Sequence, residues 1–246
     1  MSSAIKIENL SKHFGGIKAI DNLSIDIPQG IATGLIGPNG SGKTTLMNVL
    51  TGLWKPEEGT IEIVNKSKKR NNIKPNMLRK LKIARTFQDG RLIEQLSVED
   101  NLLLSTAETG YWKSLLESNN KPQKDKMEEV LKTVHLSEHR YKNAEELSYG
   151  QRKLLEIGRS LMQDADIYFF DEPFTGLFPE VVEQVLDILK DLKNKKKTLI
   201  IIEHNMSLIQ RLCDHTIVLD YGKLLAKGKP DEVLTNTKVQ EAYLGK

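Results

Sequence analysis

The chain has 246 residues, of which 39% are hydrophobic and 28% charged, and its formal net charge is +3. These values are typical of an ordinary globular protein of one large or two small domains, and the charge excess is too small to indicate a nucleic-acid partner. The single cysteine, Cys213, excludes an internal disulfide and is expected to be a buried packing thiol. No apolar run approaches the ~20 residues that span a bilayer, so we expect another chain to hold this one at any membrane.

The first elements are predicted strands. Apolar and polar residues alternate over Ile5–Glu8 and Leu23–Ile27, which indicates half-buried strands. Phe14 lies between them, before two glycines; on pattern alone a core position is favoured over a ligand contact. The apolar run Ile31–Ile36 then predicts a third strand.

A glycine-rich loop follows that third strand and precedes a predicted helix. Its residues are Gly37, Pro38, Asn39, Gly40, Ser41, Gly42, Lys43, Thr44 and Thr45. The spacing is the P-loop pattern, in which backbone N–H groups and a helix N-terminus surround a polyphosphate. Lys43 is expected to reach the β and γ phosphates, and Thr44 to offer its hydroxyl to Mg²⁺. The sequence therefore predicts a nucleoside triphosphate site.

The middle of the chain changes character twice. Asn65–Lys82 is rich in lysine and arginine without an acidic residue; a solvated loop is favoured over contact with anionic lipid. After a strand-like stretch ending at Gln88, helical spacing of leucine and valine predicts a helical insertion over residues 89–160. Asn119–Pro122 is expected to interrupt its helices.

Three further segments place polar groups at element ends. Ser148 precedes an apolar helical pattern and predicts an N-cap, with free amides that form a second potential anion site. The buried strand predicted before Asp171 and Glu172 ends in these two carboxylates, and the apolar strand Thr198–Ile202 is followed by His204. Two strands around a Tyr221-Gly222 turn and a helix beginning at Pro230 complete an α/β pattern.

The order and spacing of the P-loop, Gln88, Leu147–Gln151, Asp171-Glu172 and His204 resemble an ABC-type ATPase over essentially the whole chain. A GTPase is disfavoured. GTPases normally recognise guanine with an Asn-Lys-x-Asp element, and the stretch of this chain most similar to it lacks the aspartate. The resemblance implies a P-loop α/β fold: a RecA-like core with a small antiparallel β subdomain (1–88 and 161–246) and a helical signature subdomain (89–160).

Roles follow from the same resemblance. Residues 37–45 resemble the Walker A loop, and Phe14 now looks like the aromatic that stacks on adenine. Gln88 resembles the glutamine that meets Mg²⁺ and the attacking water, and Asp171 the aspartate that holds Mg²⁺. Glu172 looks like the general base, and His204 like the histidine that contacts the γ-phosphate.

The signature segment implies a dimer. In the family, residues corresponding to Ser148, Gly150 and Gln151 bind the γ-phosphate held by the opposite subunit, so two subunits enclose two ATP molecules. Phe178 departs from the usual Asp or Asn, and Tyr149 replaces the commoner glycine. The first departure makes room for pairing with a different ATPase subunit.

Further motifs resemble ATP-binding subunits of branched-chain amino acid importers, with urea and amide importers close by. They are Phe14-Gly15-Gly16, Arg85–Gln88, Leu147–Gln151, Ile202–Met206 and Ala242–Gly245. The implied partners are membrane permease subunits, which would dock near Asp89–Leu104, a second ATPase subunit and, indirectly, a solute-binding protein. The implied location is the cytoplasmic face of the membrane. Three alternatives stay open: an ATPase of a lipopolysaccharide-type exporter, a soluble ABC ATPase without a transport role, and a P-loop small-molecule kinase.

Overall fold

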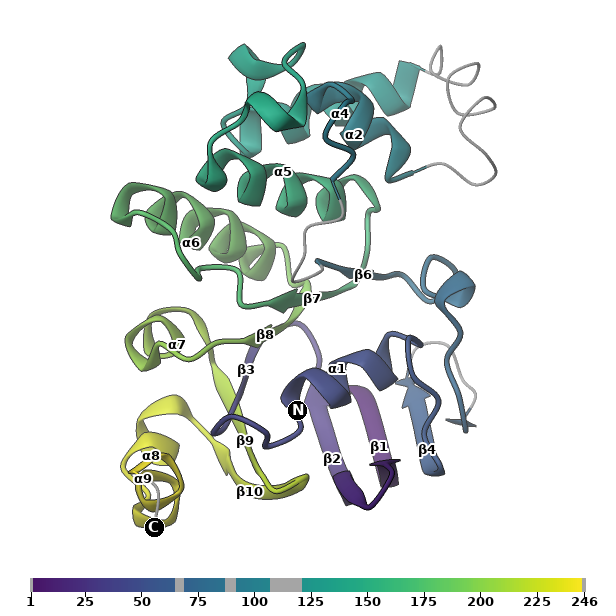
Figure 1. Cartoon of the computed structure of the whole chain (residues 1–246), viewed down its shortest axis with the longest axis vertical. Coiled ribbons are helices and arrows are strands. Elements are labelled where there is room, and N and C mark those ends of the chain that lie inside the picture. Colours follow the sequence, from purple (N-terminus) through teal and green to yellow (C-terminus); the bar gives the residue numbers. More distant parts are fainter. Residues whose placement is uncertain (1, 65–68, 87–91, 107–120, 245–246) are drawn as a thin grey trace.

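Residues 2–64, 69–86, 92–106 and 121–244 are described by the computed structural model of the chain (Figure 1). They form two β-sheets with helices around them. The first sheet is antiparallel and has the strand order β2-β1-β4-β5. Its strands are β1 (Ser3–Phe14), β2 (Ile17–Pro28), β4 (Glu58–Ile63) and β5 (Lys69–Arg70).

The second sheet has the order β10-β9-β3-β8-β7-β6 and is parallel except for the β9–β10 hairpin. Its strands are β3 (Ala32–Ile36), β6 (Ile83–Arg85), β7 (Ile167–Asp171), β8 (Thr198–Ile202), β9 (His215–Asp220) and β10 (Lys223–Gly228). Every residue of β3, β7 and β8 is buried. Helices or strands cover both faces of these central strands, which explains their uninterrupted apolar sequences.

The helices fall into three groups in Figure 1. Helix α1 lies beside the antiparallel sheet, and α6 to α9 lie beside the parallel sheet. Helices α2, α4 and α5 form a separate layer at the top of the view. The bounds are α1 (Lys43–Leu50), α2 (Val98–Leu104), α4 (Lys121–Thr133), α5 (Tyr149–Met162), α6 (Pro179–Asn194), α7 (Met206–Leu212), α8 (Pro230–Leu234) and α9 (Thr237–Leu244).

Two apolar clusters hold these layers together, and the parallel sheet contributes to both. Phe169 and Ile200 pack with α1 and the antiparallel sheet, whereas the next residues, Phe170 and Ile201, pack with the helices on the opposite side. This follows from the two-residue period of a strand. Because neighbouring strands are in parallel register, with Asp171 opposite Ile202, their carboxyl ends meet at one edge.

The predicted fold class is confirmed, with local differences. Strands β1 and β2 are longer than the predicted stretches, because irregularities in their register, with Asn9 and Asn22 at positive φ, let the pairing continue past the alternating residues. Pro122 lies in the first turn of α4, where its missing N–H costs nothing. The basic stretch 65–82 is anchored by buried Ile73 and Leu81, where it is described, and is not only a solvated loop.

The subdomain limits at 88/89 and 160/161 stay a prediction. Cys213 is buried, as expected. Within the four described stretches, no helix combines the length and the apolar character needed to cross a bilayer.

Candidate nucleotide site

The P-loop joins the end of β3 to the start of α1. Gly37 and Gly42 have φ of 146° and 103°, in the region that favours glycine. A Cβ atom on Gly37 would lie 2.1 Å from the carbonyl oxygen of Leu219, and one on Gly42 would lie 2.4 Å from that of Ala19. The loop therefore requires glycine at both positions, and it folds into the tight turn that phosphate-binding loops use.

The side chain of Lys43 lies inside this loop and binds its backbone. Its buried ammonium donates hydrogen bonds to the carbonyl oxygens of Gly37 (2.8 Å) and Pro38 (2.9 Å). Burial lowers the pKa of Lys43, while the negative charges of Glu172 and Asp171 act in the opposite direction. The Lys43 ammonium has three N–H donors, and these can bind phosphate oxygens when the ammonium leaves the two carbonyls.

Asp171 ends β7 and is buried next to Arg85. Arg85 Nη2 donates to Asp171 Oδ2 at 3.2 Å, and its Nη1 donates to Asn48 and Thr51 at 2.7 Å each. Burial raises the pKa of Asp171, and the Arg85 charge partly offsets this. Arg85 therefore ties the Asp171 carboxylate to helix α1, which begins with the P-loop lysine.

Glu172 and His204 face each other at the carboxyl ends of β7 and β8. The Nε2 atom of His204 lies 3.0 Å from Glu172 Oε1, and the Thr175 hydroxyl donates to Glu172 Oε2 at 3.3 Å. A carboxylate can only accept, so this contact places a proton on Nε2 of His204. The pair is partly exposed, which leaves it open to water or a ligand.

Glu203 sets the backbone that carries His204. Its buried carboxylate accepts hydrogen bonds from the amides of His204 (2.8 Å) and Asn205 (3.0 Å) through Oε1. These contacts fix the turn after β8 and hence the direction of the His204 side chain.

The signature segment lies at the start of α5. Ser148 caps the helix by accepting from the Gln151 amide (3.3 Å), and Gln151 returns a contact to the Ser148 amide (2.9 Å). Gly150 lies against Val181 of α6, since an added Cβ would be 3.1 Å from Cγ2 of that valine. Tyr149 donates to the carbonyl of Thr175 at 3.2 Å, which connects α5 to the loop that contacts Glu172.

Phe14 is 41% exposed at the end of β1, so it is not a core residue. Its ring meets Trp54 edge to face with centroids 4.8 Å apart, and the Lys12 ammonium lies 4.9 Å from the ring centroid. An exposed ring held by these neighbours can accept a planar base on its open face.

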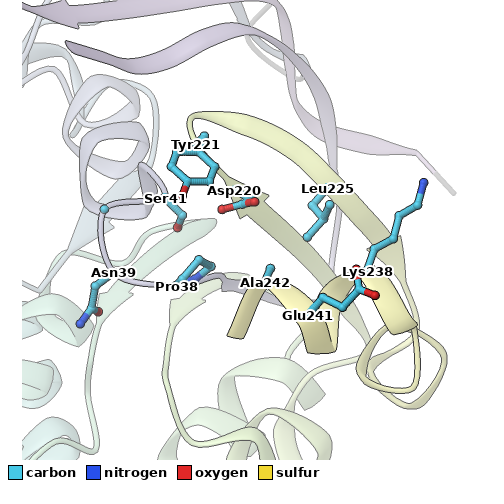
Figure 2. A pocket seen from close by; sticks show the side chains of 10 residues that line it. Pro38, Asn39, Ser41, Asp220, Tyr221, Leu225, Lys238, Glu241 and Ala242 are labelled. Carbon is cyan, nitrogen blue, oxygen red and sulfur yellow. The ribbon is translucent and has the colours of Figure 1, made fainter. Parts of the chain in front are cut away.

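A cleft of about 630 Å³ lies between the P-loop and α9 (Figure 2). Its lining includes the carboxylates of Asp220 and Glu241 and the ammonium of Lys238, and does not include Lys43 or Phe14. Because the lining lacks the P-loop lysine and the exposed aromatic ring, we do not assign this cleft to the nucleotide.

The donors for a divalent cation are oxygens. Asp171 supplies a carboxylate and Thr44 an exposed hydroxyl in the first turn of α1, whereas Gln88 lies outside the described residues. Within the described ranges no three His, Cys, Asp or Glu side chains cluster into a metal cage. Such a sparse set fits Mg²⁺, which commonly takes one or two protein ligands and completes its shell with water and substrate phosphates.

The structure therefore brings Lys43, Asp171, Glu172 and His204 together. Ser148, Gly150 and Gln151 lie at the start of α5 and make contacts there and with α6. Arg85, Thr175 and Glu203 also contact this group, although no role was predicted for them from the sequence. Arg85 and Glu203 could have been identified from the sequence, because each is a charged residue at the end of an apolar strand. No sequence pattern near Thr175 indicates its contact with Glu172.

Family models and curated relatives match most of the chain. Residues 20–175 match the family described as ABC transporter, and residues 223–246 match the one described as branched-chain amino acid ATP-binding cassette transporter. A probable branched-chain amino acid transport ATP-binding protein LivG of Methanocaldococcus jannaschii is 37% identical, with 98% of this chain and 97% of that protein covered. The high-affinity LivG protein of Escherichia coli K12 is 34% identical over the same shares of the two chains.

Solved structures show the same fold. The ADP conformation of MJ1267, an ATP-binding cassette of an ABC transporter, has a TM-score of 0.87 at 34% identity, with both chains fully covered. A dimeric post-hydrolysis state of the cassette MJ0796 bound to ADP and Pi has a TM-score of 0.78 at 26% identity, covering 92% of this chain and 98% of that one.

Proposed function

Because the chain belongs to the ABC transporter family, as an ATP-hydrolysing cassette, we propose that it energises the import of branched-chain amino acids or a related small polar solute. The observation that carries the catalytic part is the Glu172–His204 pair, 3.0 Å apart at the strand edge that faces Lys43. ATP binding would draw two such cassettes together, and hydrolysis would release them.

The P-loop residues Gly37–Thr45 hold the triphosphate in this proposal. Backbone amides of the loop and the first turn of α1 surround the phosphates, and Lys43 exchanges its contacts with the Gly37 and Pro38 carbonyls for phosphate oxygens. Phe14 stacks on the adenine.

Glu172 acts as the general base toward the attacking water. His204 orients the Glu172 carboxylate and contacts the γ-phosphate, and Glu203 keeps His204 in place. Asp171, Thr44 and Gln88 would hold Mg²⁺, which would neutralise phosphate charge. Most of the acceleration then comes from positioning and charge stabilisation.

Ser148, Gly150 and Gln151 are proposed to bind the γ-phosphate of a second cassette. Within one chain these residues make contacts at the start of α5 and with α6, and none of the described contacts joins them to Lys43, which supports a phosphate supplied by another subunit. The second cassette is a second copy of this chain or a different ATPase subunit, for which the departure at Phe178 leaves room.

The solute class rests on the relatives, which are branched-chain amino acid transport ATP-binding proteins, and on the match over residues 223–246. We further propose that the cassette lies at the cytoplasmic face of the membrane, where permease subunits contact Asp89–Leu104 and a solute-binding protein acts indirectly.

The test replaces Glu172 by Gln, which keeps the shape of the side chain but removes the base. We expect Glu172→Gln to lose ATP hydrolysis at least about 100-fold and to form an ATP-dependent dimer in size-exclusion chromatography. Lys43→Ala in the same background should abolish the dimer, and Glu180→Gln, an exposed acid at the start of α6, is the matched control with normal hydrolysis.

Normal hydrolysis by Glu172→Gln would remove Glu172 as the base. If the variant binds ATP and stays monomeric, the self-paired dimer is wrong; co-purification with a different cassette subunit is then the expected result.

A further inference from the structure

The last helix of the chain contacts the first residue of the P-loop. The amide of Gly37 donates to the phenol oxygen of Tyr243 at 2.6 Å, across 206 positions of sequence. Tyr243 is half-buried on α9, and its ring packs against the apolar cluster that contains Ile36. Burial raises its pKa to about 12, so the phenol is neutral at physiological pH.

Gly37 is thereby held from two sides. Tyr243 binds its amide, and Lys43 binds its carbonyl oxygen at 2.8 Å. These two contacts differ in what ATP does to them. In the proposed mechanism Lys43 must leave the Gly37 carbonyl for phosphate, whereas the Gly37 amide lies at the end of β3, before the loop residues that surround the phosphates.

We propose that Tyr243 is a positioning residue for ATP binding. Its hydroxyl accepts a hydrogen bond from the Gly37 amide and so keeps the P-loop in its phosphate-binding conformation when Lys43 leaves the Gly37 carbonyl to bind the nucleotide. The inference rests on the proposed role of the P-loop. Without the hydroxyl, the buried amide of Gly37 loses its acceptor, and the loop must be ordered at the moment of binding. The effect should therefore fall on nucleotide affinity and leave the chemical step unchanged.

The test is Tyr243→Phe in the full chain, which keeps the ring and removes only the hydroxyl. We expect the KM for ATP to rise about 5- to 20-fold, with kcat at saturating ATP changed less than about twofold. The Kd for ADP, measured by calorimetry, should rise by a similar factor.

Gln240→Ala is the matched control on the same helix. Gln240 donates to the carbonyl of Leu234 at 3.2 Å and so ties α9 to α8 without contacting the P-loop. Its KM should equal that of the unaltered protein. An equal rise in KM for Gln240→Ala would assign the effect to loosening of α9 and overturn the proposal.

An unchanged or lower KM in Tyr243→Phe also overturns it. Lys43→Ala separates this failure from failure of the proposed function: if Lys43→Ala still binds ATP normally, the P-loop assignment itself is wrong, whereas loss of binding there leaves that assignment standing.

Discussion

Glu172 has a left-handed backbone, with φ of 48°. Such a conformation costs a residue with a side chain about 1–3 kcal/mol and persists only where neighbouring contacts hold it. Here the Glu172 amide donates to the carbonyl of Ile202 at 3.0 Å, while His204 and Thr175 bind its carboxylate. The strained turn therefore directs a carboxylate out of the end of a buried strand, where the proposed mechanism places its base.

Phe14 allows a direct test at the same scale, because Trp54 lies 4.8 Å from it. In a Trp112→Phe background, Trp54 is the one remaining tryptophan of the sequence. We expect ATP to change its fluorescence, since a base stacked on Phe14 alters the surroundings of the neighbouring indole. Phe14→Ala should remove the change and weaken ATP binding about 5- to 30-fold, and an undiminished signal would contradict the stacking role.

Ser148, the N-cap residue of α5, combines a structural role with a proposed binding role. Ser148 caps the helix through the Gln151 amide, and it is also proposed to face the phosphate of a partner subunit. Loss of a cap lowers the stability of a helix whether or not the cap binds a ligand. The two roles must therefore be separated by a substitution that keeps the cap.

Ser148→Asp is that substitution, because Asp caps helices as well as Ser does, but its charge repels phosphate. We expect Ser148→Ala to lower the free energy of unfolding by about 1 kcal/mol. Ser148→Asp should retain stability within about 0.5 kcal/mol and yet abolish the ATP-dependent dimer of Glu172→Gln. Measured by urea unfolding and size-exclusion chromatography, a dimer that survives Ser148→Asp would exclude Ser148 from phosphate contact.

Across the whole molecule, the nucleotide site is assembled from distant parts of the chain. Strands β3, β7 and β8 bring Lys43, Asp171 and His204 to one edge, and α9 returns Tyr243 to the start of the loop. A ligand that binds these parts only when they are folded together must stabilise the entire fold.

ATP at about 100 times its Kd should therefore raise the free energy of unfolding by about 2.7 kcal/mol. Lys43→Ala should show almost no gain, because it lacks the ammonium that is proposed to bind the phosphates. Lys190→Ala, which removes a lysine paired with Asp187 on α6, should keep the full gain. Chemical unfolding with and without ATP measures this; an equal gain in Lys43→Ala would contradict binding through the P-loop.

Local features of the protein could be predicted from the amino-acid pattern. Glycine spacing predicted the P-loop, apolar runs predicted β7 and β8, and Ser148 predicted the start of α5. These signals are local because backbone conformation, strand burial and helix capping depend on residues within a few positions of one another. The same patterns correctly placed Asp171, Glu172 and His204 at strand ends.

Which of these groups meet depends on how the strands and helices pack. The 3.0 Å contact of Glu172 with His204 depends on the register of β7 against β8, and Arg85 reaches Asp171 because β6 pairs with β7. Phe14 turned from a predicted core residue on pattern alone to an exposed one, since nothing in its neighbours reveals which side of the hairpin end is covered. The Tyr243–Gly37 bond has no local signal at all, because its partners come together only when α9 packs beside the finished sheet.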